Sequence, residues 1–214
     1  MLSDMKAAIF DLDGVIVDTA KYHYLAWKRL ADELGLPFGP ADNERLKGIG
    51  RMECMDIILE LGGRSMEAEE RERQAARKNA WYVDYISAMT GGEILAGARE
   101  YIESLRLRGV AIALGSASKN APLILGRLGI AGLFDAVIDG SAVKKSKPDP
   151  EVFLAVAAAL GALPSECVVF EDAAAGIVAA HRAGMFAVGV GSAEDLPGSE
   201  LVVRGLFELL PPGA

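Results

Sequence analysis

Two pairs of acidic residues stand directly after short apolar runs and are the strongest candidates for chemistry in this sequence. Asp11 and Asp13 follow the run Ala-Ala-Ile-Phe, and Glu171 and Asp172 follow Cys-Val-Val-Phe. If both runs are parallel strands, their carboxyl ends meet at the edge of the sheet where open α/β sheets bind ligands. Four gathered carboxylates need a cation, and oxygen ligands of this kind favour Mg²⁺. The alternative for the first pair is an ordinary turn ahead of Gly14.

Two further polar residues are candidates for the same site. Ser116 follows another apolar run, and Lys147 precedes an expected helix. Ser116 comes after Ala-Ile-Ala-Leu-Gly, and its hydroxyl with the amides of Ala117 and Ser118 can donate hydrogen bonds to phosphate oxygens. The alternative for Ser116 is a helix cap. Lys147 belongs to a lysine-rich segment that would ordinarily be a solvated loop, but Pro148 restricts its approach. A bond before proline can be cis or trans at low cost, so the sequence leaves the isomer of the bond between Lys147 and Pro148 open.

Short apolar runs alternate with helical patterns at the start of the chain and throughout its second half. This alternation predicts an α/β fold with a Rossmann-like parallel sheet. The expected strands cover residues 6–11, 110–116, 136–139, 167–170 and 186–190. The expected crossover helices cover residues 120–128, 150–160 with Asp149 as the N-cap, and 173–183. Residues from about 19 to 89 have helical periodicity and almost no strand pattern, which predicts an inserted all-helical domain. The expected division is therefore an α/β core domain at 1–17 and 91–214 and a helical domain at 18–90.

The composition excludes several classes of protein. Of the 214 residues, 51% are hydrophobic and 24% are charged, which suits a globular chain with a real core. Lys+Arg 22 against Asp+Glu 30 gives a net charge of −8, which disfavours nucleic acid and anionic membranes as partners. Cys54 and Cys167 have no metal-ligand spacing, so we expect two buried thiols in a cytoplasmic protein. Because no apolar seam stands out on the helices, we expect a monomer.

The candidate residues together resemble the motifs of the haloacid-dehalogenase-like phosphotransferase superfamily. The Asp-x-Asp-Gly segment at 11–14, then Ser116, Lys147 and the pair at 171–172 occur in that family's order and approximate spacing. The resemblance covers nearly the whole chain and implies that the insertion at 18–90 is an all-helical cap domain. It also implies that Ser116 and Lys147 hold a transferring phosphoryl group.

The same resemblance implies a role for each acidic residue. Asp11 would be the nucleophile that forms an aspartyl phosphate. Asp13 would be the general acid and base, which protonates the leaving oxygen and later deprotonates the acceptor. The cofactor would be Mg²⁺, held by Asp11, the backbone carbonyl of Asp13 and Asp172, with Glu171 alongside.

The core motifs fit both a phosphatase and a phosphomutase, so segments of the cap domain must distinguish the two. Residues 10–23, 46–51, 77–79 and 115–120 resemble those of sugar phosphomutases in the superfamily. That resemblance implies a sugar-phosphate substrate and interconversion of β-glucose 1-phosphate and glucose 6-phosphate through a 1,6-bisphosphate. One alternative is a Mg²⁺-dependent sugar-phosphate or phosphoglycolate-type phosphatase. Another is a catalytically silent phosphate-binding protein, although no core residue is missing.

Several cap residues have implied roles in a mutase. Thr19 and His23 are four residues apart and share a helix face. The resemblance implies that His23 and Lys78 sense the sugar, that Thr19 restrains Asp13, and that Arg51 grips the distal phosphate. The alternative roles are structural: a core histidine, a solvated lysine and a loop-capping arginine. The other residues implied in substrate binding are Trp27, Lys47, Gly48, Ala117, Ser118, Lys119 and Asn120. The alternative role of Trp27 is packing.

Overall fold

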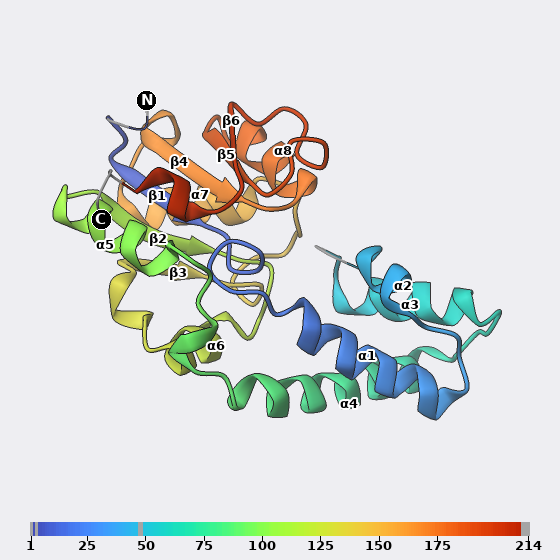
Figure 1. The fold of residues 1–214 in the computed structure, drawn as a ribbon. Coiled ribbons are helices and arrows are strands. Elements are labelled where there is room, and N and C mark those ends of the chain that lie inside the picture. The colour runs from blue at the N-terminus through green and yellow to red at the C-terminus, as the bar shows by residue number, and fades with distance from the viewer. Residues whose placement is uncertain (1, 3, 47–48, 211–214) are drawn as a thin grey trace. The chain divides into compact units, whose positions relative to one another are not determined.

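The computed structural model describes residues 2, 4–46 and 49–210 of the chain. The chain forms two compact units. The first consists of Met1–Asp18 together with Thr90–Ala214, and the second is Thr19–Met89. Across the described residues, no helix is both long and apolar enough to cross a membrane. The two units are described separately below (Figure 1).

The first unit is built on a parallel sheet, which has six strands over the described residues in the order β3-β2-β1-β4-β5-β6. The strands are β1 (Ala7–Phe10), β2 (Ala111–Gly115), β3 (Ala136–Ile138), β4 (Cys167–Glu171), β5 (Phe186–Val190) and β6 (Leu201–Val203). Every neighbouring pair is parallel, which confirms the predicted α/β class. The strand order reverses between β1 and β4, and ligands of such sheets bind at this switch point.

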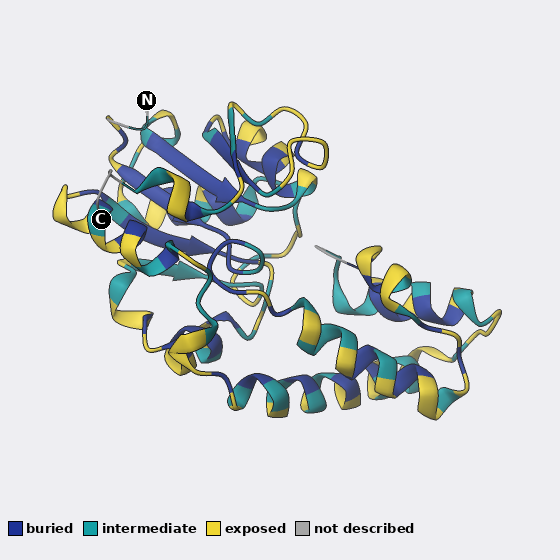
Figure 2. Ribbon diagram, in the orientation of Figure 1, coloured by how far each residue is buried: buried dark blue, intermediate teal, exposed yellow. Residues whose placement is uncertain are grey.

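Helices pack on the sheet because its strands consist mainly of apolar residues, and most strand residues are buried (Figure 2). The helical elements are α5 (Ala98–Leu107), α6 (Ala121–Leu128), α7 (Glu151–Leu160), α8 (Ala174–Arg182), and the 3-10 turns η1 (Gly91–Glu93), η2 (Ala131–Leu133), η3 (Pro164–Glu166) and η4 (Leu206–Leu209). Ile9 of β1 lies in one buried cluster with Phe153 of α7 and Ile177 of α8. Its neighbour Phe10 contacts Tyr101 of α5, with ring centroids 6.4 Å apart. Successive residues of β1 therefore face different helices, as the two-residue period of a strand requires.

The second unit is helical and contains α1 (Ala20–Leu34), α2 (Pro40–Glu44), α3 (Arg51–Leu61) and α4 (Ala68–Ser87). Helix α1 ends at Gly35, whose φ of 67° is the left-handed conformation of a common helix stop. The unit has its own buried apolar cluster, which includes Trp27 and Leu30 of α1 with Met55 and Ile58 of α3. Both α1 and α3 contact the long helix α4.

The chain segments that lead to and from the helical unit lie side by side within the α/β unit. Val17 pairs with Ile94 in an isolated antiparallel bridge, and the Leu95 amide donates to the Ile16 carbonyl at 2.9 Å. The entering segment is compact because the amides of Ile16 and Val17 both donate to the Leu12 carbonyl. The insertion therefore begins and ends at one place in the sheet unit.

Several element boundaries differ from the predicted ones. β1 ends at Phe10, so Asp11 and the residues after it form a loop rather than continuing the strand. Helix α7 begins at Glu151 with Pro150 at the N-cap position, and Asp149 instead accepts a hydrogen bond from the Glu151 amide at 3.1 Å. The carboxylate that was expected to cap the helix thus bonds to its first residue.

Candidate active site

Three carboxylates gather at the switch point of the sheet. Asp11 follows β1, Glu171 ends β4 and Asp172 comes next. One oxygen atom from each of the three lies within 4.8 Å of the others. Four carboxylates were expected here, but the Asp13 side chain is not in this group. The strand ends at Phe10, so Asp11 and Asp13 do not share a strand face, and only Asp11 joins the other carboxylates.

Two glycines leave space for these carboxylates. Gly14 has a φ of 71°, and a Cβ atom built on it would lie 2.0 Å from Oδ2 of Asp172. A Cβ on Gly176, in the first turn of α8, would lie 2.0 Å from Cδ of Glu171. Larger residues at either position would displace a carboxylate. The three converging oxygen donors suit a hard divalent cation, so this acidic group can hold a metal ion.

Lys147 is buried among the carboxylates. Its Nζ donates to Oδ1 of Asp11 at 2.5 Å and to Oε2 of Glu171 at 2.7 Å, and its side chain is 7% exposed. Burial alone would lower the pKa of Lys147, but the charges of Asp11 and Glu171 outweigh burial and raise it. Burial raises the pKa of Glu171, and Asp11 and Asp172 add to this effect while Lys147 opposes it. The bond between Lys147 and Pro148, whose isomer the sequence left open, is cis.

Both oxygens of the Asp11 carboxylate have hydrogen-bond donors. Lys147 donates to Oδ1, and the Asp13 amide donates to Oδ2 at 3.0 Å. Asp11 is buried, whereas Asp13 is half-buried two residues further along the loop. The fixed orientation of Asp11 favours one line of approach to an electrophile, which is the requirement for a nucleophilic carboxylate.

Ser116 follows β2, the strand beside β1, and therefore lies at the same edge of the sheet. It is buried, and its Oγ accepts a hydrogen bond from the Ser118 amide at 3.1 Å. That amide was expected to donate to phosphate, but here it bonds to Ser116. The N-cap residue of α6 is Asn120, so Ser116 is not that helix's cap. Ala117 and Lys119 are exposed between them.

A second polar cluster lies inside the helical unit. Lys78 of α4 is only 2% exposed, so its predicted alternative, a solvated lysine, is wrong. Its Nζ lies 2.9 Å from Nδ1 of His23 on α1. The same Nζ lies 4.4 Å from the ring centroid of Trp27 and 5.0 Å from that of Tyr82. The ammonium group of Lys78 therefore lies against aromatic rings, whereas that of Lys147 contacts carboxylates.

The described residues provide no acidic partner for the cationic side chains of this cluster. The pKa of Lys78 is lowered to about 7, mainly by burial; Cys54 opposes this effect and the charge of Arg51 adds to it. Burial also lowers the pKa of His23, and Lys78 and Arg51 add to this effect. Over the described part of the chain, no carboxylate forms an ion pair with Lys78 or Arg51. Such a cluster can receive an anion, which would supply the missing negative charge.

The remaining predicted cap residues have different surroundings. Thr19 is fully buried, and its Oγ1 accepts a hydrogen bond from the Tyr82 hydroxyl at 3.3 Å. Tyr82 was not predicted, although its position four residues after Lys78 places it on the same face of α4. Trp27 is 2% exposed and packs in the apolar cluster of this unit. Lys47 and Gly48 lie outside the described residues.

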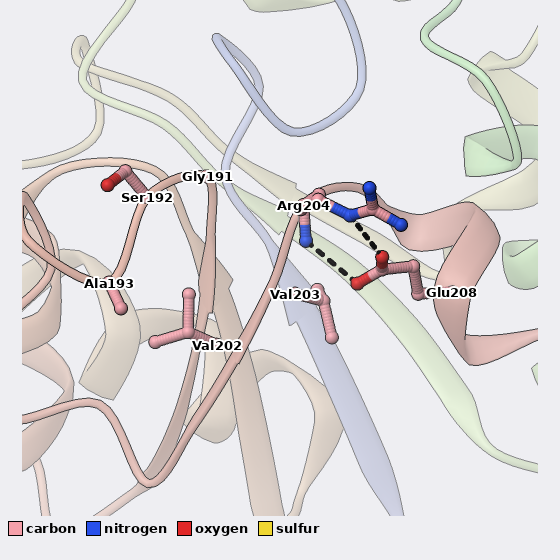
Figure 3. A pocket seen from close by; sticks show the side chains of 7 residues that line it. All are labelled: Gly191, Ser192, Ala193, Val202, Val203, Arg204 and Glu208. Atoms are coloured by element: carbon pink, nitrogen blue, oxygen red, sulfur yellow. Dashed lines mark hydrogen bonds and ion pairs between the residues drawn. The ribbon is translucent and has the colours of Figure 1, made fainter.

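A hollow of about 580 Å³ lies elsewhere, beyond the ends of β5 and β6 (Figure 3). Val202 and Val203 line it together with Arg204 and Glu208. The Arg204 amide and Nε donate to the two carboxylate oxygens of Glu208, at 3.0 Å and 2.5 Å. Because its two charged side chains neutralise each other, the hollow offers far less chemistry than the acidic cluster.

Known proteins resemble this chain over most of its length. β-Phosphoglucomutase from Bacillus subtilis is 47% identical over 207 residues, which are 96% of this chain and 92% of that protein. A phosphorylated carbohydrates phosphatase from Thermotoga maritima is 31% identical and covers 97% of this chain and 95% of its own length. The crystal structure of a β-phosphoglucomutase from Clostridium difficile has 45% identity and a TM-score of 0.91, covering 96% of this chain and 93% of that one.

A family model described as haloacid dehalogenase-like hydrolase matches residues 5–184, which include the acidic cluster, Ser116 and Lys147. The match agrees with the parallel sheet and with the carboxylates at its switch point. The chain therefore belongs to the haloacid dehalogenase-like hydrolase family.

Proposed function

We propose that this protein is a phosphomutase that interconverts β-glucose 1-phosphate and glucose 6-phosphate through an aspartyl-phosphate enzyme and a glucose 1,6-bisphosphate. The relatives named β-phosphoglucomutase, at 47% and 45% identity, support this proposal. One observation carries it: each unit has its own buried lysine, Lys147 paired with carboxylates and Lys78 with no carboxylate partner among the described residues. A bisphosphate intermediate needs a second anion site besides the reacting one, whereas a simple phosphatase does not.

In the first step, a carboxylate oxygen of Asp11 attacks phosphorus and the bond between phosphorus and the sugar oxygen breaks. Asp13 donates a proton to that leaving oxygen, and in the reverse transfer it takes the proton from the attacking hydroxyl. Lys147 and the Ser116 hydroxyl hold the phosphoryl oxygens. Two hydrogen bonds to Asp11, from Lys147 and the Asp13 amide, support this assignment because they orient the nucleophile.

The proposed cofactor is Mg²⁺, for which the oxygen-only donor set is suited. Asp11, Asp172 and the backbone carbonyl of Asp13 would hold it, with Glu171 alongside. When bound, Mg²⁺ neutralises charge on the phosphoryl oxygens during transfer.

The helical unit is proposed to recognise the sugar and its distal phosphate. Arg51 would grip that phosphate bidentately, because it is half-buried and has no carboxylate partner among the described residues. His23 and Lys78 would respond to the sugar, and Thr19 would restrain Asp13. The further substrate-binding residues proposed are Trp27, Lys47, Gly48, Ser116, Ala117, Ser118, Lys119 and Asn120.

The decisive experiment incubates the protein with Mg²⁺, β-glucose 1-phosphate and a trace of the 1,6-bisphosphate, and follows glucose 6-phosphate and free phosphate together. Rapid formation of glucose 6-phosphate with little free phosphate is expected. Arg51→Ala should reduce mutase turnover much more than hydrolysis of p-nitrophenyl phosphate, which has no distal phosphate. Arg73→Ala, on an exposed part of α4, is the matched control. Equal losses of both activities in Arg51→Ala would remove Arg51 from the proposed role.

A sugar-phosphate phosphatase is the second candidate, supported by the 31% identity to the phosphatase from Thermotoga maritima. In that reaction water takes the phosphoryl group from Asp11. The same assay separates the two candidates, because free phosphate as the main product would replace the mutase proposal with this one.

We also propose that the protein is a monomer in a reducing cytoplasm. Its cysteines, Cys54 and Cys167, are both free and buried, which confirms the sequence prediction of buried thiols and suits such a compartment. Light scattering at micromolar concentration is expected to give the mass of one chain, 22.6 kDa. A dimer mass would contradict the proposal.

A further inference from the structure

Tyr82 is a fully buried tyrosine in the helical unit, among the largest side chains with no solvent exposure. A buried hydroxyl destabilises the fold unless it has a hydrogen-bond partner, and a phenylalanine would fill the same space without that cost. The Tyr82 hydroxyl donates to Oγ1 of Thr19 at 3.3 Å. Thr19 is thus a hydrogen-bond partner that favours tyrosine over phenylalanine at this position.

The ring of Tyr82 contacts the two other polar residues of the cluster. His23 stacks on it with centroids 4.0 Å apart and an interplanar angle of 29°. Lys78 Nζ lies 5.0 Å from the Tyr82 centroid while it contacts Nδ1 of His23 at 2.9 Å. Thr19 and His23 are four residues apart, and so are Lys78 and Tyr82, so adjoining faces of two helical segments meet at this ring.

We propose that Tyr82 is a positioning residue for the mutase reaction, an inference that rests on the proposed function. A hydroxyl that accepts a hydrogen bond from Tyr82 must direct its own proton elsewhere, so Tyr82 selects the direction in which Thr19 donates. The stacked ring holds the plane of His23. Below pH 7 Lys78 is an ammonium group that only donates, so under these conditions Nδ1 of His23 accepts and the imidazole proton is on Nε2.

Two substitutions separate the hydroxyl from the ring. Tyr82→Phe keeps the ring and removes the hydrogen bond to Thr19, and kcat for β-glucose 1-phosphate is expected to fall about fivefold with little change in KM. Tyr82→Leu removes both, and kcat is expected to fall about 50-fold. Hydrolysis of p-nitrophenyl phosphate should stay within about twofold in both variants, because its chemistry belongs to the other unit. Tyr85→Phe, on the same helix, is the matched control, since its hydroxyl is close enough to the Arg29 guanidinium to raise the pKa of Arg29.

Imidazole NMR provides a measurement that does not depend on turnover. The chain has two histidines, so a His181→Gln background leaves His23 as the one observed ring. At pH 6, the wild-type His23 and the Tyr82→Phe variant are expected to show the Nε2-protonated tautomer, and Tyr82→Leu a mixture of tautomers.

Unchanged mutase kcat in Tyr82→Phe would overturn the role of the hydroxyl, and this variant preserves the packed ring. An unchanged tautomer in folded Tyr82→Leu would overturn the role of the ring. A wild-type protein without mutase turnover would instead contradict the proposed function, while the NMR spectra would still decide whether Tyr82 positions His23.

Discussion

Two buried lysines, one in each unit, have opposite electrostatic surroundings. Lys147 bonds to the carboxylates of Asp11 and Glu171, and its pKa is raised. Lys78 contacts His23 and two aromatic rings, and its pKa is lowered to about 7. Both side chains are almost entirely removed from water. Because both lysines are buried, the difference between their pKa values comes from their different partners.

The difference corresponds to two kinds of task. Lys147 has its counter-charges within the protein, which suits a residue that must remain cationic while a phosphoryl group passes. Lys78 lacks a carboxylate partner among the described residues, so an incoming anion would be its first counter-charge. In the proposed mechanism, Lys147 therefore keeps its charge throughout, whereas the charge state of Lys78 changes when an anion binds.

The largest expected effect comes from Asp11→Asn. This substitution removes one of the two carboxylates that bond to Lys147, so its surroundings become more like those of Lys78. Loss of the proposed nucleophile should reduce turnover of β-glucose 1-phosphate and of p-nitrophenyl phosphate by about 10⁴-fold or more. Asp84→Asn, on an exposed part of α4, is the control. Turnover within tenfold of wild type would refute the nucleophile assignment.

Replacing each lysine with methionine should change stability in opposite directions. Lys147→Met leaves Asp11 and Glu171 buried without their cation, and a loss of about 3–5 kcal/mol in unfolding free energy is expected without metal. Lys78→Met removes a buried cation for which residues 4–46 and 49–210 provide no carboxylate partner, so stability should stay level or rise by about 1 kcal/mol. Urea unfolding at pH 6 with EDTA measures both. Equal destabilisation by the two variants would show that the difference in surroundings has no energetic consequence.

The two lysines should also differ in how they couple stability to pH. Lys78 has a folded pKa of about 7 against 10.5 in the unfolded chain, so the unfolded state binds more protons between these values. Its contribution makes unfolding free energy rise with pH from about 7 to 10.5, by at most about 1.4 kcal/mol per pH unit. Lys147, with its raised pKa, contributes stability that stays constant below 10.5 and is lost only at higher pH.

The pH dependence is measured by urea unfolding of the wild type and Lys78→Met between pH 6 and 10. The difference between the two curves should be flat below pH 7 and should then slope upward. A flat difference throughout the range would mean that Lys78 is as strongly charged as Lys147.

The smallest effect is expected at the glycine that makes room for Glu171. Gly176→Ala places a Cβ where the Glu171 side chain lies, so Mg²⁺ binding should weaken about tenfold as that carboxylate shifts. Titration calorimetry measures the affinity directly. Gly126→Ala is the control, since the space around Gly126 is open and alanine favours a helix. Wild-type affinity in Gly176→Ala would indicate that Glu171 is not needed for the metal.

Sequence patterns predicted the parallel sheet and the residues at its switch point because both depend on local order. The apolar run before Glu171 ends a buried strand, and so does the run before Asp11. Strand β6 was missed because it has three residues at the edge of the sheet. Helix α5 was also missed, although Tyr101, Ile102 and Leu105 lie on one buried face.

Details of the two clusters depended on tertiary contacts. The Asp13 side chain was expected among the carboxylates, but the chain leaves the strand at Phe10 and the loop places Asp13 outside the group. Tyr82 has the spacing of an ordinary core residue, and its contacts arise because α1 packs against α4. A pattern along one helix cannot identify which polar groups the neighbouring helix presents.

The bridge between Val17 and Ile94 joins the ends of a 71-residue insertion within the sheet unit. An insertion with adjoining ends can be exchanged by recombination without rethreading any strand, since the order of the parallel sheet stays intact. Descendants of one catalytic scaffold can therefore acquire new substrate preferences in a single genetic event. Phosphatases and mutases sharing about a third to a half of their residues with this chain are an expected product of that history.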